Sequence, residues 1–202
     1  DDDFYVGKSN FYAFEMINKW PKWEKNFLNI NGEKFSGKSH LVNIFLKKFN
    51  GIRSDVNSLN DENIKSIKPY QNIVLEDLNL NINEKLIYSL FNIIDQDNKF
   101  LIVTSMKPIS EINFELEDLR SRTKNCLFAN IQNPDDELMF ALILKNLSDR
   151  QITLDKKLIN FIIKRIERSY GKIFEFIYKI DKISLKKKKS IDFKIINEAL
   201  EE

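Results

Sequence analysis

Short runs of continuous apolar residues recur between residues 27 and 131 of this chain. Three of them are Phe27–Asn31, Asn72–Leu75 and Phe100–Thr104. Strands that are buried on both faces of a sheet are apolar throughout, whereas half-exposed strands alternate, so these runs predict buried parallel strands. A fourth run, Cys126–Ile131, is weaker and predicts one further strand.

Helical spacing fills the segments between these runs. Apolar residues recur three and four positions apart in His40–Phe49, which Gly51 closes, and in Glu84–Gln96. The segment Gly51–Tyr70 has few strong apolar positions and predicts only a short strand and a short helix. Strand and helix therefore alternate, which is the pattern of an α/β parallel sheet with crossover helices.

After Asn133 the pattern becomes helical alone. Asn133 is expected to cap the next helix, with Pro134 in its first turn and the acidic residues 135–137 favouring the amino-terminal dipole. Later helices are indicated by apolar residues at helical spacing, namely Leu158, Ile162 and Ile166, then Ile173, Phe176, Ile177 and Ile180. A last short helix is expected over Asp192–Leu200. We predict an α/β domain over residues 1–133 and a small all-helical domain over residues 134–202.

Composition excludes several classes of protein. Hydrophobic residues make up 43% of the 202 residues, yet no apolar run approaches the roughly 18 residues of a membrane span, so we expect a cytoplasmic globular protein. One cysteine, Cys126, cannot form an internal disulfide, and one histidine, His40, cannot build a multi-histidine metal site. A net charge of +2 is too balanced to indicate nucleic-acid binding.

The segment Gly32–Ser39 matches the phosphate-loop pattern G-x-x-x-x-G-K-[ST], with a predicted strand before it and a helix after it. In such a loop the backbone N–H groups hold phosphate, Lys38 reaches the β and γ oxygens, and Ser39 offers a hydroxyl to Mg²⁺. We therefore expect ATP or ADP with Mg²⁺ to bind here. A second string, Gly7–Ser9, lacks the first glycine and a preceding strand, so it is not a phosphate loop.

Two strand ends supply further candidates. Nucleotide hydrolases with this loop hold magnesium through a carboxylate at the end of a neighbouring strand, where Glu76 and Asp77 stand. We assign Glu76 to the metal and Asp77 to catalysis; the alternative is a pair of solvated acids. Thr104 ends the next strand, where it either senses the γ-phosphate or is an ordinary polar residue.

Arg122 is a candidate arginine finger, a residue that completes the nucleotide site of a neighbouring subunit. It lies just before the last predicted strand, in Asp118–Arg122. A finger is worth roughly 10³ to 10⁵ in rate, or about 4 to 7 kcal/mol. The alternative is a surface arginine that pairs with Glu115 or Asp118.

Three other features have two interpretations each. Trp20 and Trp23 either cover the nucleotide base or close the core, and we favour the core. The run Lys186–Lys189 is expected in a turn between two helices, either as a solvated loop or in contact with a phosphate backbone. His40, which follows the phosphate-loop serine, is typical of a packing or polar-contact residue.

With these residues in place, the chain resembles the AAA+ proteins of the DnaA family, especially the short Hda-type regulators. The segment Asp3–Asn10 is similar to the family's entry segment, which implies that Val6 and Asn10 lie near the adenine. The segment Ser36–Leu41 resembles the family's phosphate loop, and Leu119–Arg122 its finger segment. The resemblance implies a P-loop AAA+ base domain with a helical lid, and a nucleotide site that includes Phe35, Ser36, Gly37 and His40.

The chain departs from the family pattern in its hydrolytic residues. Glu76-Asp77 stands where the initiator has two aspartates, and Met106 replaces an acidic residue. The lid position that carries a sensor arginine falls on Gly171, with Lys172 beside it in the nucleotide site. Because the finger is kept while these residues differ, the resemblance implies weak intrinsic ATPase activity and action on a partner's ATP.

The function implied by this resemblance is negative regulation of replication initiation. The chain would bind ATP or ADP and pair with the ATP-bound initiator DnaA, so that Arg122 completes the initiator's hydrolytic site. The sequence stops at Glu202, before the initiator's DNA-binding module, so DNA contact is expected to be indirect or weak. Contact with the sliding clamp would use a segment outside this sequence, and a homo-oligomer is compatible with the family.

Other functions fit parts of the same pattern. A self-acting AAA+ ATPase, such as a helicase loader or a transposition helper, shares the base domain and a similar lid. An initiator-related adaptor that binds the origin without catalysis would use Lys186–Lys189. A nucleoside or shikimate-type kinase also has a phosphate loop, but the helical tail disfavours it.

Overall fold

The computed structural model describes residues 4–79 and 82–201. The acidic start of the chain, including Asp3 of the predicted entry segment, lies outside the described residues, as do residues 80–81 and Glu202. The described chain divides into two compact units. The sheet unit contains Asn10–Gly32 and Ser36–Gln132, together with Phe4; the helical unit contains Tyr5–Ser9, Glu33–Phe35 and the chain from Asn133 onward.

The sheet unit alternates strands and helices. Its elements are α1 (Phe11–Asn18), β1 (Phe27–Gly32), α2 (Lys38–Phe49), β2 (Ile52–Asp55), the 3₁₀ turn η1 (Val56–Ser58), α3 (Asp61–Ile67), β3 (Asn72–Leu78), α4 (Glu84–Gln96), β4 (Phe100–Ser105), the 3₁₀ turn η2 (Ile109–Glu111), α5 (Glu117–Lys124) and β5 (Leu127–Ile131). The strands form one parallel sheet in the order β2-β3-β4-β1-β5. The predicted α/β fold class is therefore confirmed.

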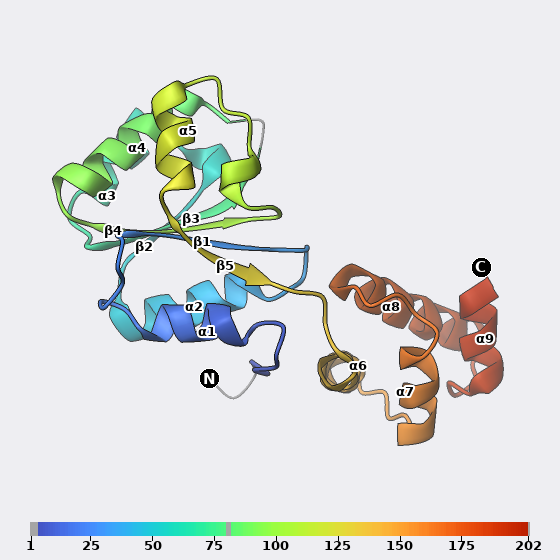
Figure 1. Ribbon diagram of the computed structural model, residues 1–202. Helices are drawn as coiled ribbons and strands as arrows, with labels where there is room; N and C mark the ends of the chain where they lie inside the picture. Colours follow the sequence, from blue (N-terminus) through green and yellow to red (C-terminus); the bar gives the residue numbers. More distant parts are fainter. Residues whose placement is uncertain (1–3, 80–81, 202) are drawn as a thin grey trace. The chain divides into compact units, whose positions relative to one another are not determined.

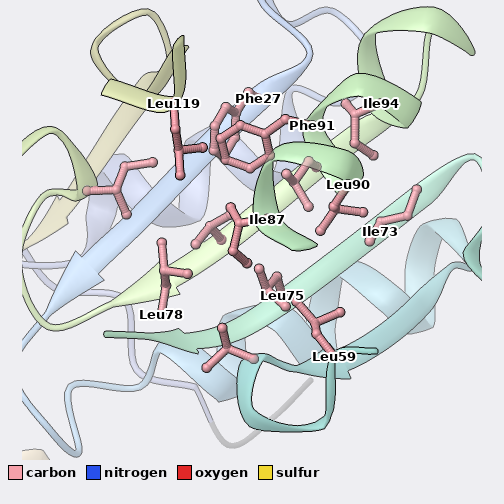
Figure 2. Packing of buried hydrophobic residues seen from close by; sticks show 14 of the residues in the cluster. Phe27, Leu59, Ile73, Leu75, Leu78, Ile87, Leu90, Phe91, Ile94 and Leu119 are labelled. Carbon is pink, nitrogen blue, oxygen red and sulfur yellow. The ribbon is translucent and has the colours of Figure 1, made fainter. Parts of the chain in front are cut away.

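Helices cover both faces of this sheet, with α3, α4 and α5 on one face and α1 and α2 on the other (Figure 1). The buried residues of α4 recur at helical spacing and therefore share one face of the helix; they are Ile87, Leu90, Phe91 and Ile94. They pack on the strands, where the rings of Phe27 and Phe91 lie 4.7 Å apart (Figure 2). Full burial of each such side chain contributes about 1.5–3 kcal/mol.

Aromatic side chains close the other face of the sheet. Trp20 lies 4.5 Å from the ring of Phe49, and Trp23 lies 6.0 Å from the ring of Phe45. The indole N–H of Trp23 donates to the carbonyl of Met16 at 2.7 Å. The interpretation of both tryptophans as core residues is confirmed.

The helical unit consists of α6 (Asp136–Asp149), α7 (Lys156–Ile163), α8 (Tyr170–Lys187) and α9 (Phe193–Glu201), with a core of its own. The prediction that Asn133 caps the first of these helices is wrong. Asp135 is the cap, because its backbone is extended and its carboxylate accepts the N–H of Leu138 at 2.9 Å. Pro134 therefore precedes the helix.

The lysine run was predicted in a turn between two helices, and only Lys188 and Lys189 lie between α8 and α9. Lys186 and Lys187 are the last residues of α8, where their charge complements the helix dipole. Lys188 ends the helix with a left-handed backbone, φ 52°. None of the described helices has the length and apolar character needed to cross a bilayer.

Candidate nucleotide-binding site

The phosphate loop depends on two glycines. Gly37 precedes α2 with φ 93°, a conformation that L side chains rarely adopt, and a Cβ there would lie 3.0 Å from the ring of Phe4. A Cβ on Gly32 would lie 2.9 Å from the Ser36 hydroxyl and 3.0 Å from Cβ of Ile131. The loop motif is therefore a steric requirement of this backbone.

Polar groups of this loop fit a phosphate. Lys38 is buried and its ammonium donates to the carbonyl of Gly32 at 2.7 Å. The Ser36 hydroxyl is also buried and makes no hydrogen bond with any described residue. No side-chain hydrogen bond caps the start of α2 at Gly37, and the positive end of a helix dipole attracts an anion. The residues present suit the phosphates of a nucleotide.

The end of β3 carries Glu76 and Asp77, and their environments differ. Glu76 is largely buried and pairs with Arg53 at 3.2 Å. Asp77 is exposed and has a left-handed backbone, φ 59°, beside a register shift between Leu75 and Leu78. The buried hydroxyl of Thr104 accepts the N–H of Asp77 at 3.0 Å. Thr104 thus orients the strand end that carries the two acids.

Oxygen donors at this edge of the sheet suit a magnesium ion. Parallel strands end at one edge, as the pairing of Asn31 with Ser105 and of Leu78 with Ser105 shows. Ser39, in the first turn of α2, and Asp77, near the end of β3, are both exposed. Hydroxyl and carboxylate oxygens are ligands that Mg²⁺ accepts together with phosphate oxygens, whose charge it neutralises when bound.

Arg122 lies at the opposite edge of the sheet. It borders a cavity of about 320 Å³ that is also lined by Phe27, the first residue of β1, and Leu101, the second residue of β4. Because β1 runs from this edge to the phosphate loop, Arg122 and its own loop are separated by roughly the length of a six-residue strand, about 20 Å. The structure does not bring Arg122 to the nucleotide site of its own chain.

The other predicted contacts are distributed between the two units. In the sheet unit, the ring of His40 lies 5.2 Å from that of Phe4, and Asn10 is buried with its carbonyl accepting the N–H of Phe14 at 3.0 Å. In the helical unit, Val6 is exposed.

Phe35 and Lys172 also belong to the helical unit. Phe35 packs on Phe174 with 4.8 Å between ring centroids. Lys172 pairs with Glu175 at 2.9 Å, which raises the pKa of the lysine. Phe35 therefore contacts α8, and Lys172 forms an ion pair within that helix.

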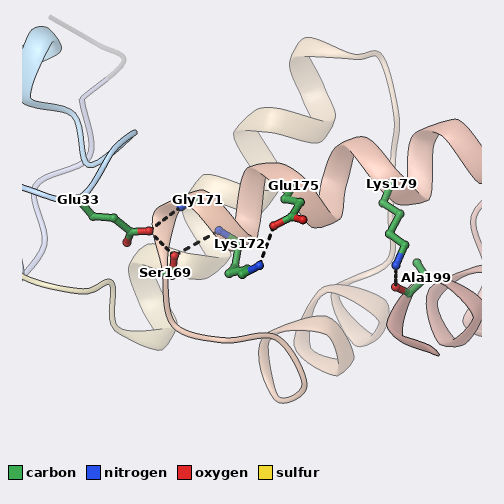
Figure 3. Close-up of polar contacts among 7 residues, drawn as sticks. All are labelled: Glu33, Ser169, Gly171, Lys172, Glu175, Lys179 and Ala199. Carbon is green, nitrogen blue, oxygen red and sulfur yellow. Dashed lines mark hydrogen bonds and ion pairs between the residues drawn. The ribbon is translucent and has the colours of Figure 1, made fainter. Parts of the chain in front are cut away.

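Glu33 is a residue that sequence reasoning missed. Its carboxylate accepts the N–H groups of Tyr170 at 3.1 Å and Gly171 at 3.3 Å, and the hydroxyl of Ser169, as Figure 3 shows in part. Ser169 in turn accepts the N–H of Lys172 at 3.3 Å. The carboxylate thus binds the positive end of the α8 dipole. The sequence did contain a signal for this role, since an acidic residue is unexpected in a loop that binds anionic phosphate.

The sequence was compared with known protein families and with curated proteins. No model of a known protein family matches the chain. The chromosomal replication initiator DnaA of Caldanaerobacter subterraneus subsp. tengcongensis is 25% identical over 227 aligned positions, which cover 100% of this chain and 51% of that protein. The chain spans about half the length of such curated relatives.

Solved structures share the fold. Domain III of the Thermotoga maritima replication initiation protein DnaA matches with a TM-score of 0.79 at 19% identity, covering 99% of this chain and 94% of that one. A replication initiator DnaA bound to AMPPCP and single-stranded DNA matches with a TM-score of 0.71 at 19% identity, covering 93% of this chain and 67% of that one. The chain is homologous to DnaA in its AAA+ region, as the resemblance implied.

Proposed function

We propose that this homologue of the DnaA AAA+ region binds ATP or ADP with Mg²⁺ and stimulates ATP hydrolysis by an initiator DnaA in trans. Such activity is an Hda-like negative regulation of replication initiation, in the cytoplasm. Arg122 would complete the initiator's site, and the hydrolysed initiator would be inactive. The partners are the initiator and, through a segment outside this sequence, the sliding clamp.

The position of Arg122 supports this proposal most directly. The side chain lies at the edge of the sheet opposite its own phosphate loop, near the starts of β1 and β4. An arginine about 20 Å from its own nucleotide site does not reach that nucleotide, so a role for it in ATP hydrolysis requires another subunit's nucleotide. One third of the side chain, 32%, is exposed, which leaves it accessible to a partner.

Nucleotide binding has separate support. The steric requirement for Gly32 and Gly37, the buried Ser36 hydroxyl and the uncapped start of α2 all suit phosphate. A homologous DnaA has been solved with the ATP analogue AMPPCP bound. We assign Lys38 to the phosphates, Ser39 and Glu76 to the metal, and Asp77 to catalysis.

A self-acting ATPase is the second candidate. Lys38, Ser39 and Asp77 are in place for it, since the phosphate loop is intact and Asp77 is exposed. This candidate needs no partner and predicts hydrolysis that Arg122 does not influence in a single chain. The two functions therefore differ in the site at which ATP is cleaved.

The test is hydrolysis of labelled ATP preloaded on the initiator of the same organism. The full-length protein is added with DNA-loaded clamp, as wild type, as Arg122→Ala or as Arg120→Ala. Arg120 lies on the same helix and is exposed, so it is a matched control for loss of one positive charge. We expect stimulation by wild type and Arg120→Ala, and a loss of 10³-fold or more in the stimulated rate with Arg122→Ala, roughly the value of a finger.

Two results would overturn the proposal. No stimulation by the wild-type protein would exclude action on the initiator and favour the self-acting ATPase, provided that the protein hydrolyses ATP alone. Equal stimulation by Arg122→Ala would show that the protein acts without this arginine, as an adaptor does.

A further inference from the structure

The helix that carries Arg122 has little apolar anchorage. In α5 only Leu119 and Thr123 are buried among eight residues. No side chain caps its start at Leu116. A helix with so few buried residues takes its orientation from polar contacts with its neighbours. The direction in which Arg122 points therefore depends on those contacts.

Two carboxylates of α4 hold α5, one near each end. Glu84, in the first turn of α4, accepts the N–H groups of Glu115 and Leu116, both at 2.8 Å, where the chain enters α5. Asp95, in the last turn of α4, accepts Nη1 of Arg122 at 2.7 Å. The finger helix is thus fixed along α4.

The guanidinium of Arg122 lies between two groups of α4. Its central carbon is 5.3 Å from the ring centroid of Tyr88, seven residues before Asp95 and hence on the same helix face. The second carboxylate oxygen of Asp95 accepts the side-chain amide of Asn26 at 3.4 Å. The hydroxyl of Tyr88 donates to Asp118 at 3.4 Å, one turn before Arg122 on α5. Asp95 and Tyr88, which contact the guanidinium, are therefore each fixed by a further hydrogen bond.

We propose that Asp95 is a positioning residue for Arg122, which it holds extended along the α4 face so that the guanidinium is oriented before the partner's nucleotide arrives. This inference rests on the proposed action of Arg122 in trans. The contact uses Nη1, which leaves Nε and Nη2 of the five-donor guanidinium for phosphate oxygens. Asp95 and a partner's phosphate can accordingly bind the same arginine at once.

The ion pair between Asp95 and Arg122 is expected to contribute little to the stability of the fold. The Asp95 side chain is 54% exposed and that of Arg122 is 32% exposed, and pairs exposed to this degree contribute little to folding. Arginine has many rotamers, and restricting them before binding lowers the entropy lost when the transition state is contacted. The effect should thus appear in the rate of hydrolysis.

The experiment uses the initiator assay with Asp95→Asn, Asp95→Glu and the control Asp97→Asn. Asp97 is an exposed acid next to α4 whose loss removes the same charge without touching Arg122. We expect Asp95→Asn to lower the maximal stimulated rate about tenfold and to leave the half-saturating concentration unchanged. Asp95→Glu should restore most of the rate, and Asp97→Asn should behave as wild type.

A second measurement reports on Arg122 itself. In ¹⁵N-labelled protein the Nε–H signal of Arg122, assigned with Arg122→Lys, should show restricted motion in wild type and in Asp97→Asn, and greater motion in Asp95→Asn. An unchanged signal would overturn the inference whatever the assay gives.

The two proposals fail in different ways. Absence of stimulation by the wild-type protein would sink the proposed function and, with it, this role of Asp95. Stimulation that Arg122→Ala abolishes but Asp95→Asn leaves intact would overturn only the inference about Asp95. A faster rate with Asp95→Asn would also overturn it, since the ion pair would then restrain the finger and not prepare it.

Discussion

Two Gly-Lys-Ser strings occur in this chain. They differ in the backbone conformation and surroundings of their glycines. Gly37 has φ 93° and begins a helix, whereas Gly7–Ser9 follow a segment without strand structure. A Cβ on Gly7 would find its nearest atom at 3.6 Å, which is ordinary van der Waals contact. Of Gly7 and Gly37, only Gly37 therefore requires the absence of a side chain.

Gly37→Ala should weaken nucleotide binding and destabilise the fold by about 1–2 kcal/mol, the cost of a left-handed conformation in a residue with a Cβ. Binding of a fluorescent ADP and urea unfolding measure the two effects. Gly7→Ala is the matched control and should leave both unchanged. Equal losses in the two variants would contradict the steric argument.

Cys126 should be unreactive in the folded protein. Its side chain is buried, its thiol donates to the carbonyl of Thr123 at 3.1 Å, and burial raises its pKa from 9.0 to about 12. A thiol reagent at pH 8 should label native protein far more slowly than protein in urea. Rapid labelling of the native protein would show that this buried position opens readily.

The same pKa gives the direction of a pH effect. Because the folded state keeps the Cys126 thiol protonated, its contribution to stability is complete below pH 9 and is lost as pH rises from about 9 towards 12. The difference in unfolding free energy between wild type and Cys126→Ala should therefore shrink over that range. A difference that grows would contradict the assigned direction.

At the scale of elements, the start of α8 depends on a residue far away in sequence. Glu33→Gln keeps one acceptor oxygen but removes the charge from the helix dipole, so it should destabilise the protein by about 1 kcal/mol. Hydrogen exchange should rise at the first-turn amides of α8. Urea unfolding and exchange together test this.

Glu175→Gln is the control for that change. It also removes one negative charge, but from an exposed side chain within α8, which forms an ion pair with Lys172. The unfolding midpoint should stay where it is. A shift as large as that of Glu33→Gln would mean that net charge on the helix, and not the capture of its first turn, is responsible.

The elements show how far the sequence predicts this fold. Apolar periodicity located α4 with its observed ends, Glu84–Gln96, because a buried helix face requires that spacing. Periodicity did not locate α5, whose two buried residues give no repeat. The cap at Asp135 was missed because Asn133 has an equally suitable side chain, and the choice between them is set by backbone conformation.

The same difference appears in the candidate site. The loop Gly32–Ser39 follows from a motif, because phosphate chemistry fixes its glycines and lysine. The partners of Glu33 and Arg122 did not follow from any motif. Each pairs with a residue distant in the chain, so only the folded structure brings the two together.

At the scale of the whole molecule, nucleotide binding should stabilise the fold. A ligand at 100 times its dissociation constant adds about 2.7 kcal/mol if it binds the folded state alone. Saturating MgADP should therefore raise the thermal midpoint of the wild-type protein and leave that of Lys38→Ala unchanged. Lys8→Ala, in the other Gly-Lys-Ser string, should respond as wild type does. A shift that survives in Lys38→Ala would place the nucleotide elsewhere.

The helical unit is assembled from three separate stretches of chain, and this has a consequence for a newly made molecule. Glu33 and Tyr170 are 137 residues apart. A ribosome adds roughly 5–20 residues per second, so Glu33 leaves it roughly 7–27 s before Tyr170 does. Strand β1 is synthesised just before Glu33, and strands β2 to β5 are synthesised within that interval. All strands of the sheet are therefore synthesised before α8. Glu33 leaves the ribosome well before the helix whose first turn it binds.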